Sequence, residues 1–238
     1  MTNIESTKIK EVISKVCEPS SDQIAKFFTF YKRMVETNEV MNLTAITEFE
    51  EVLIKHFLDS ISLMKYVDLE NIKLLDLGTG AGFPGVPLHI MNPNMDVTFL
   101  DSLQKRINYL SNVCSEIGLV NNEFIHGRAE DFGKDKLYRE KYDYVVSRAV
   151  ANLATLSEYA LPFVKVGGYF VSYKSEKTDE EINEAKKAIQ ILGGKIEKVE
   201  SFDLEDAGIR SFIFIKKEKE TPKKFPRKPG VAKKEPIK

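Results

Sequence analysis

The sequence has few of the residues that build disulfide or metal scaffolds. Its 238 residues include two cysteines, three histidines and no tryptophan. Cys17 and Cys114 cannot form a disulfide framework or a cysteine-rich zinc site, and three scattered histidines offer little for a His/Cys site. We therefore expect reduced thiols, no metal and a cytoplasmic protein.

Long apolar runs are also missing. No stretch approaches the ~18 residues that would indicate a membrane span. The first residues, MTNIESTKIKEV, have no apolar signal core. We expect no secretion and no membrane contact, and we expect a monomer.

The charge is nearly balanced but unevenly distributed. Lys+Arg total 35 and Asp+Glu total 36, so the formal net charge is −1. Residues 216–238 hold ten Lys/Arg and three Glu, a net charge of +7, which leaves −8 on residues 1–215. A protein that binds nucleic acid over its whole surface is strongly basic, so this class is excluded. A basic arm on an acidic body remains.

Hydrophobic periodicity divides the chain into three regions. Residues 1–66 are expected to form an N-terminal helical extension, because Ser20 with Gln23 and Thr47 with Glu50 fit capping boxes before amphipathic stretches. In residues 67–215, short apolar runs alternate with helical segments. Residues 216–238 contain four prolines and no hydrophobic period, which is typical of a flexible or extended arm.

The central region predicts an α/β fold with a seven-stranded sheet. The expected strands are Ile72–Leu77, Asp96–Leu100, Glu123–His126, Tyr142–Ser147, Gly168–Tyr173, Lys195–Phe202 and Arg210–Ile215. Alternation of strands with helices near 84–91, 103–117, 150–165 and 178–192 indicates a mostly parallel sheet covered on both faces. The last two strands have no long helix between them, so we expect an antiparallel hairpin at one end.

A glycine-rich loop follows the first predicted strand, in Asp76-Leu77-Gly78-Thr79-Gly80-Ala81-Gly82-Phe83-Pro84-Gly85. In a parallel sheet this loop lies at the carboxyl end of the strand, where such folds bind ligands. Gly80, Gly82 and Gly85 fit G-x-G-x-x-G, which alone favours a dinucleotide. Asp76 and the spacing D-x-G-x-G-x-G are instead typical of S-adenosylmethionine (SAM) methyltransferases, where a carboxylate meets the methionine ammonium. The alternative is a tight structural turn.

The ends of the next two strands supply candidates for the rest of an adenosine ligand. Asp101 is positioned to accept hydrogen bonds from ribose hydroxyls, in NAD and SAM enzymes alike, or to cap the following helix. Ala129 and Glu130, with Asp131 nearby, are candidates to contact the adenine. Asp101 favours an adenosine ligand without choosing between the two cofactors, whereas the segment of Ala129 and Glu130 is the one that lines the adenine in SAM enzymes.

The fourth predicted strand ends at Ser147 and Arg148, the point that faces the transferring methyl in SAM enzymes. Enzymes that methylate exocyclic amines often have an Asn/Asp-Pro-Pro-aromatic motif at this point, and this chain has none. Enzymes that methylate carbon 5 of a pyrimidine need a cysteine nucleophile, and no cysteine is placed for that role. Guanine N7 has its own lone pair, so its methylation needs neither the motif nor the cysteine. We therefore take Ser147 and Arg148 as catalytic candidates, with Arg148 positioning ligand or, alternatively, forming a helix-start ion pair.

Several motifs together resemble the bacterial RsmG (GidB) family of 16S ribosomal RNA guanine-N7 methyltransferases. They are Asn42-Leu43-Thr44-Ala45-Ile46, His56-Phe57-Leu58-Asp59-Ser60, the glycine loop, Gly127-Arg128-Ala129-Glu130, Ser147-Arg148-Ala149 and Pro226-Arg227-Lys228-Pro229-Gly230. The resemblance implies a class I SAM-dependent (Rossmann-like) fold and a guanine at position 527 of 16S RNA, free or in the small subunit, as substrate.

The resemblance also implies a cofactor site. SAM would be bound at Gly78, Phe83, Ala129, Glu130 and Arg148, and Asp76, Gly80 and Asp101 would contribute as described above. Asn42 and His56–Ser60 would lie near the site, either binding or packing.

The basic segment is the expected RNA contact. Phosphate contacts by lysine and arginine give affinity that does not depend on sequence. The candidates are Lys223, Lys224, Arg227, Lys228, Lys233 and Lys234, with Lys174 as a further substrate contact. The alternatives are a methyltransferase acting on another RNA or a small molecule, a nucleotide-dependent oxidoreductase, and an inactive RNA-binding protein.

Overall fold

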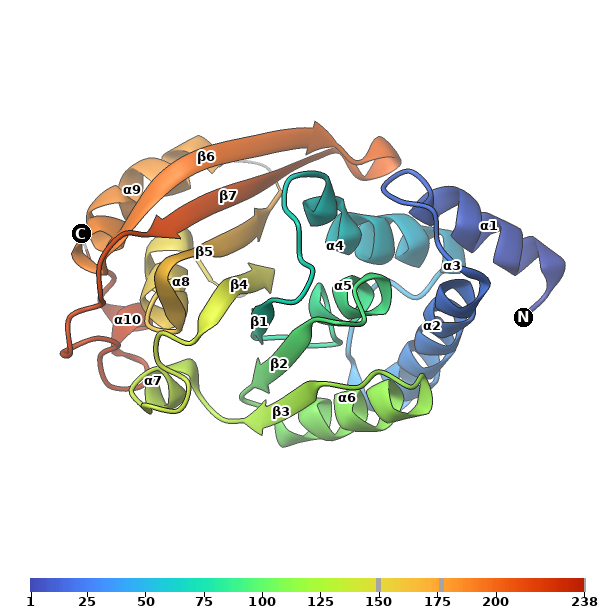
Figure 1. The fold of residues 1–238 in the computed structure, drawn as a ribbon, viewed down its shortest axis with the longest axis horizontal. Coiled ribbons are helices and arrows are strands. Elements are labelled where there is room, and N and C mark those ends of the chain that lie inside the picture. Colours follow the sequence, from blue (N-terminus) through green and yellow to red (C-terminus); the bar gives the residue numbers. More distant parts are fainter. Residues whose placement is uncertain (149–150, 176–177, 238) are drawn as a thin grey trace.

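A computed structural model describes residues 1–148, 151–175 and 178–237. Its centre is a seven-stranded sheet in the order β3-β2-β1-β4-β5-β7-β6 (Figure 1). The strands are β1 (Lys73–Leu77), β2 (Asp96–Asp101), β3 (Asn122–His126), β4 (Tyr142–Arg148), β5 (Val164–Lys174), β6 (Gly194–Asp203) and β7 (Ile209–Lys217). All seven predicted strands are therefore present.

Strand direction decides where a site can form. Strands β1 to β5 pair in parallel, and β7 is antiparallel to both β5 and β6, which confirms the hairpin at the end of the sheet. The carboxyl ends of β1, β2, β4 and β5 consequently share one edge. The start of β7 joins them there, because Ser211 is in register with Lys174.

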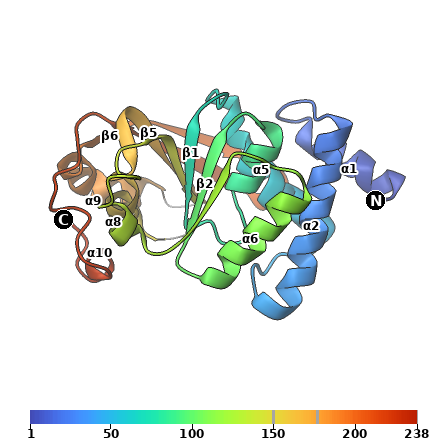
Figure 2. The same cartoon turned by 60° about the horizontal axis from the view of Figure 1, so that its bottom comes forward.

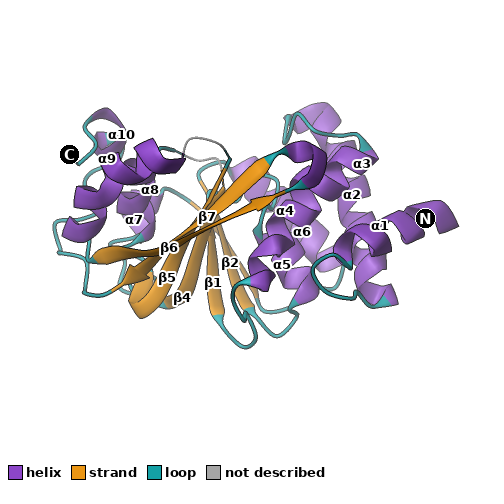
Figure 3. Ribbon diagram, turned by 90° about the horizontal axis from the view of Figure 1, so that it is seen from above, coloured by secondary structure: helices purple, strands orange, loops and turns teal. Residues whose placement is uncertain are grey.

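Helices cover both faces of the sheet (Figure 3). One layer contains α1 (Asn3–Ile13), α2 (Ser21–Met41), α3 (Phe49–Val52), η1 (Leu53–Leu58), α4 (Asp59–Ile61), η2 (Ser62–Lys65), α5 (Gly85–Met91) and α6 (Gln104–Glu116). The other contains α7 (Ala129–Phe132), α8 (Leu153–Ala160), α9 (Thr178–Ile191) and α10 (Val231–Lys234). Helix η3 (Glu205–Ala207) joins β6 to β7. Each layer has its own apolar core.

The N-terminal helices belong to the first of these cores. Helix α2 begins with the predicted capping box of Ser20 and Gln23, and its buried stripe includes Phe27 and Phe30. Figure 2 shows α2 beside α6 on the outer side of this layer. Asn42 ends α2 in the left-handed conformation, with φ of 49°. Asn42 therefore has a structural role at this turn.

The capping box predicted at Thr47 is wrong. The helix begins at Phe49 with Glu48 as its N-cap, and no side chain caps it. The Thr47 carbonyl instead accepts a hydrogen bond from the Tyr31 hydroxyl (3.2 Å). The helix then widens into η1, a π-helix over Leu53–Leu58. Such segments are rare and often occur at functional sites.

Of the two expectations for the C-terminal arm, flexible or extended, the flexible one is wrong. Residues 218–237 pack along α7 and α8, with Phe225 and Ala232 buried. Arg139 donates to the carbonyls of Thr221 (2.6 Å) and Phe225 (2.9 Å). The contacts are made by isolated residues in an irregular segment, so they leave no hydrophobic period in the sequence.

Among the described residues, no helix is long and apolar enough to cross a membrane.

Candidate functional site: two adjoining cavities

The glycine loop between β1 and α5 is tied to the end of β2. The Gly78 amide donates to the Leu100 carbonyl (2.8 Å), and the Gly80 amide donates to Asp101 Oδ2 (2.9 Å). Gly80 has φ of 59°, and a Cβ there would meet only the Gly78 carbonyl oxygen, at 3.9 Å. The loop thus presents bare backbone to open space, as a closely approaching ligand requires.

A cavity of about 400 Å³ lies against this loop. Its lining residues include Gly78, Gly80, Phe83, Asp101 and Arg148. Five of the residues predicted from the sequence to bind the cofactor therefore lie together around one cavity. This volume lies within the usual range of about 300–1,000 Å³ for small-ligand sites.

Asp101 has acceptor capacity left for a ligand. Its Oδ2 accepts from Gly80 and its Oδ1 accepts from the amide of Leu103 (2.9 Å). Oδ2 also accepts a longer bond from Arg106 Nη1 (3.4 Å). A carboxylate has about four lone-pair sites, so these three bonds leave one for a hydroxyl donor, and a second hydroxyl would take the place of Arg106. Helix α6 has Leu103 as its N-cap without a side-chain cap, so Asp101 is not the capping residue. An adenosine ribose fits this position.

Asp76 lies beneath the loop rather than in the cavity. The side chain is fully buried, and Oδ2 accepts from Thr79 Oγ1 (2.6 Å) and the Gly85 amide (2.9 Å). A Cβ on Gly85 would come within 2.6 Å of the same oxygen. Burial raises the pKa of Asp76 to about 6, although these two hydrogen bonds lower it. Asp76 therefore holds both ends of the loop, and its Oδ1 has no partner in the described residues.

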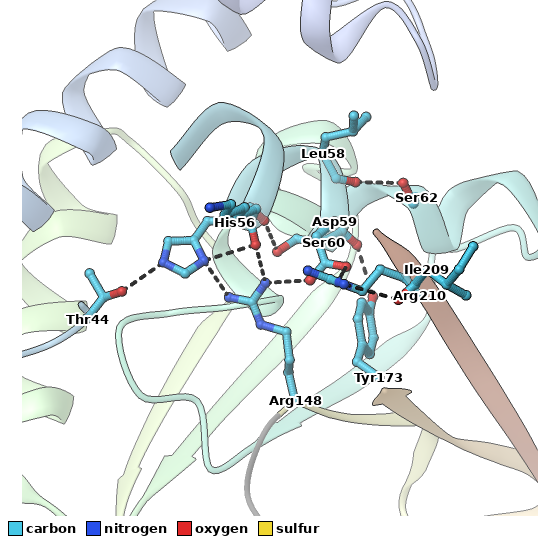
Figure 4. Close-up of polar contacts among 11 residues, drawn as sticks. Thr44, His56, Leu58, Asp59, Ser60, Ser62, Arg148, Tyr173, Ile209 and Arg210 are labelled. Carbon is cyan, nitrogen blue, oxygen red and sulfur yellow. Dashed lines mark hydrogen bonds and ion pairs between the residues drawn. The ribbon is translucent and has the colours of Figure 1, made fainter. Parts of the chain in front are cut away.

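Arg148, at the end of β4, is held by three groups from η1 and α4 (Figure 4). Its Nη1 donates to Asp59 Oδ2 (2.7 Å) and the Lys55 carbonyl (3.2 Å). Its Nη2 lies 3.1 Å from His56 Nδ1. The guanidinium also lies over the Phe83 ring, 5.1 Å from the centroid. The predicted ion-pair alternative is thus correct in part, because an ion pair fixes the side chain that lines the cavity.

His56 is neutral in this arrangement. Burial and the nearby Arg148 charge lower its pKa to about 3. Nδ1 lies 3.1 Å from both Arg148 Nη2 and the Lys55 carbonyl oxygen. Arginine can only donate and already supplies a donor to that carbonyl through Nη1, so Nδ1 is assigned as the acceptor from Arg148, and Nε2–H donates to Thr44 Oγ1 (2.9 Å). The ring also stacks on Phe83, with centroids 4.4 Å apart. His56 therefore both packs and orients Arg148.

Ser147 does not reach the cavity. It is fully buried, and its hydroxyl donates to the Leu77 carbonyl (2.7 Å), which links β4 to β1. Neither cavity includes it among the described lining residues. We therefore assign Ser147 to the strand junction rather than to the chemistry. Ala149, from the same motif, lies outside the described residues.

A second cavity of about 420 Å³ adjoins the first. Both cavities are lined by His56 and Arg148. The second also includes Lys174, at the end of β5, which donates to the Ala151 carbonyl (3.2 Å) and pairs with Glu181 (2.6 Å). Lys174 is one of the substrate contacts predicted from the sequence, and it lies in the second cavity together with Arg148.

Ala129 and Glu130 begin α7 and lie under the C-terminal segment. Glu130 is buried, and its Oε1 accepts from the Gly230 amide (3.0 Å). The described lining of the glycine-loop cavity does not include either residue. The tail motif and the proposed adenine segment are therefore in direct contact.

Arg227 is engaged within the protein. It makes hydrogen bonds to both carboxylate oxygens of Glu158, the shortest at 2.7 Å, and Glu158 is 1% exposed. It also donates to the Glu235 carbonyl (2.8 Å). The prediction of an RNA contact at Arg227 conflicts with this pairing. In contrast, the side chains of Lys223, Lys224, Lys228, Lys233 and Lys234 are exposed.

Sequence reasoning missed Lys55 and Arg210, which line the second cavity, and left Asp59 undecided. Asp59 and His56 belong to the quoted HFLDS motif, so a signal for them was present. Arg210 lies in no such motif.

Comparison with known proteins agrees with the geometry. The family model described as "GidB: rRNA small subunit methyltransferase G" matches residues 23–211. "Ribosomal RNA small subunit methyltransferase G" of Alkaliphilus oremlandii is 53% identical and covers 93% of each chain. The protein of that name from Clostridium novyi is 52% identical over 89% of this chain and 88% of its own.

Solved structures show the fold alone. A SAM-dependent methyltransferase from Aquifex aeolicus superposes with a TM-score of 0.52 at 20% identity, covering 69% of this chain and 92% of that one. TYW2 of M. jannaschii, solved in complex with AdoMet, gives 0.50 at 16% identity, covering 64% and 72%. These matches confirm the predicted class I SAM-dependent methyltransferase fold.

The family match and the relatives at about half identity extend over most of the chain, and they confirm the resemblance seen in the motifs: this chain belongs to the GidB family, rRNA small subunit methyltransferase G.

Proposed function

We propose that this protein transfers a methyl group from SAM to N7 of the guanine at position 527 of 16S ribosomal RNA. The observation that carries the proposal is the pair of adjoining cavities, with Arg148 and His56 in the wall of both. One cavity has the glycine loop and ribose acceptor that suit SAM. The other leaves space for a substrate at the edge where β4 and β5 end.

The side chains around Arg148 suit a target that needs no deprotonation. SAM supplies an electrophilic methyl group, and guanine N7 supplies a lone pair without carrying a proton. His56 is neutral, and its two nitrogens are engaged by Thr44 and Arg148, so it does not serve as a general base. The protein's contribution is alignment, which can account for a large part of a methyl-transfer rate.

A covalent route through cysteine is disfavoured by the same structure. Cys114 lies inside α6, where burial raises the pKa of its thiol to about 12. Burial also raises the pKa of the Cys17 thiol. The chain has no third cysteine. This supports a lone-pair nucleophile over a carbon-5 target.

For the RNA contact we propose the exposed lysines of the C-terminal segment, Lys223, Lys224 and Lys228, with Lys174 at the second cavity. Ala129 and Glu130 are proposed to lie on the adenine side of SAM, where docking of Gly230 fixes Glu130. Arg227 is left out, because Glu158 already binds its guanidinium.

The test is methyl transfer by the full chain to small subunits isolated from cells that lack this protein. With SAM present, mass mapping of the 16S RNA is expected to find a new N7-methylguanine at position 527. Purified 16S RNA without ribosomal proteins is the parallel substrate. Absence of the methyl group on both substrates, with SAM binding intact by calorimetry, would overturn the proposal.

A further inference from the structure

The second cavity has a marked excess of positive charge. Among its described lining residues, the cations are Lys55, Arg148, Lys174 and Arg210, and the acids are Asp59 and Glu181. His56 adds no charge, because its pKa is lowered to about 3. A cavity with two more cations than anions favours an anionic ligand over a neutral or cationic one.

The four cations differ in how firmly other groups of the protein hold them. Arg148 is held by Asp59, His56 and the Lys55 carbonyl, and Lys174 by Glu181 and the Ala151 carbonyl. Arg210 has a longer ion pair, 3.6 Å from Nε to Asp59 Oδ1, and its Nη1 donates to the carbonyl of Ile209 (3.1 Å). Figure 4 shows Arg210 on the far side of Asp59 from His56. Asp59 keeps its shorter bond to Arg148 if Arg210 turns away.

Lys55 is the second cation whose side chain can leave its present partner and bind a ligand in the cavity. It pairs along the helix with Glu51, four residues earlier, and its side chain is 33% exposed. Exposed pairs of this kind contribute little free energy, so exchange of Glu51 for another anion costs little. The π-helix places Lys55 at the cavity while its carbonyl binds Arg148.

The floor of the cavity is apolar. Tyr173 and Phe212 are buried there in an edge-to-face contact, with centroids 4.7 Å apart. Cations beside aromatic surface match a nucleotide, which has an anionic phosphate and a flat, weakly polar base.

We propose that the second cavity receives the target nucleotide, and that Arg210 and Lys55 bind the phosphates on either side of it. This inference rests on the proposed function, since it names where that substrate sits. A nucleotide there lies next to Arg148 and hence next to the cofactor cavity. Arginine suits the phosphate because its planar donors can make two parallel charge-assisted hydrogen bonds.

The experiment compares Arg210→Met, Lys55→Met and the double variant with the wild-type chain. Binding to unmethylated small subunits is measured over a series of KCl concentrations, together with KM and kcat. Each lost phosphate contact is expected to lower the slope of log affinity against log salt by about 0.7–0.9. KM for the subunit should rise about tenfold in Arg210→Met, as for loss of one charge-assisted hydrogen bond. The affinity for SAM should stay within twofold.

Arg33→Met is the matched control. Arg33 is an arginine of α2 that pairs with Glu36 and Glu116, away from both cavities. It should leave the salt slope and KM unchanged. A merely structural role for Arg210 would lower thermal stability and kcat without moving the salt slope.

Two results would overturn the inference. One is an unchanged salt slope and KM in the double variant. The other is weakened SAM binding with subunit affinity intact, which would assign these cations to the cofactor. A wild-type chain that methylates no small-subunit RNA would instead remove the proposed function, so the two failures are distinguishable.

Discussion

Two arginine–carboxylate pairs in this molecule have nearly the same geometry and different surroundings. Arg148 binds Asp59 at 2.7 Å, and Arg227 binds Glu158 at 2.7 Å. Both carboxylates are buried, at 4% and 1% exposure. Arg148 faces two cavities, whereas Arg227 fastens the C-terminal segment to α8. The strength of an ion pair therefore does not identify a site, and the space beside it does.

The remaining partners of each arginine sharpen the difference. Arg227 is bound by Glu158 and by the Glu235 carbonyl of its own segment. Arg148 is bound by one carboxylate, one carbonyl and one neutral imidazole, all from η1 and α4. Mixed partners fix the direction of the guanidinium plane, which matters for aligning a ligand. A bidentate pair with one carboxylate, supported by a carbonyl of the same segment, is enough to fasten a segment.

The largest expected effect is on stability, from Arg227→Leu. It leaves Glu158 buried without a partner, and breaking a buried pair costs about 3–5 kcal/mol. Urea unfolding should show this loss, and Lys228→Leu, next to it and exposed, should change the unfolding free energy by less than about 0.5 kcal/mol. The double variant Arg227→Leu/Glu158→Leu should recover most of the loss. A loss under 1 kcal/mol in the single variant would contradict the fastening role.

The next effect is on the rate. Arg148→Met should lower methyl transfer about 100-fold, because small misplacements of a ligand cost that much. This corresponds to about 2.7 kcal/mol in the barrier. Stability should fall less than in Arg227→Leu, since Asp59 keeps Arg210 nearby. Single-turnover methylation at saturating SAM measures the effect, and Arg148→Lys tests whether charge alone suffices. A rate within threefold of wild type would remove Arg148 from the site.

A third effect concerns the pH dependence of stability around Arg148. Folding lowers the pKa of His56 from 6.5 to about 3, so the unfolded chain binds a proton there first. The His56 contribution to stability is therefore lost as pH falls below 6.5, by at most about 1.4 kcal/mol per pH unit. Asp76 acts in the opposite direction. Folding raises its pKa from 3.8 to about 6, so its contribution to stability is lost as pH rises from 3.8 to 6.

The variant His56→Asn separates these two contributions. Between pH 7 and pH 5 it should lose about 2 kcal/mol less stability than the wild-type chain, since the His56 term is removed. The terms of Asp76 and of His89, whose pKa burial lowers to about 4, are the same in both proteins. Urea unfolding at pH 7, 6 and 5 measures the difference, with His126→Asn as the control because His126 is exposed. Parallel pH profiles for wild type and His56→Asn would mean that the imidazole is not held neutral by its surroundings.

The sequence predicted the fold well because the relevant signals are local. Seven apolar runs became seven strands, and the glycine loop lies where a strand–loop–helix pattern requires it. Gly78, Gly80, Phe83 and Asp101 line one cavity for the same reason, since parallel strands end at one edge. The π-helix had no such signal, because the apolar spacing of residues 52–64 also fits an ordinary helix.

The parts that could not be predicted depend on partners distant in the chain. Arg227 looks like a solvent-exposed cation in the sequence, and its partner Glu158 is 69 residues earlier. Arg210 joins the second cavity only because β7 pairs antiparallel with β5. Ser147 is adjacent to Arg148, but strand alternation turns it inward to Leu77. Neither the charge of a residue nor its position in a motif shows whether its side chain points into a cavity or into the protein interior.

The smallest expected effect separates the lysines of the C-terminal segment from its arginine. Lys223→Gln/Lys224→Gln should leave stability within about 0.5 kcal/mol, because both side chains are exposed. If they contact phosphates, subunit affinity falls a few-fold and the salt slope drops by about 1.4–1.8. Lys186→Gln/Lys187→Gln on α9 is the matched control, because this pair of neighbouring lysines is also exposed and lies outside the segment in the sequence. Equal slopes for the two double variants would remove Lys223 and Lys224 from the RNA contact and leave them, like Arg227, in a segment that holds α7 and α8 in place.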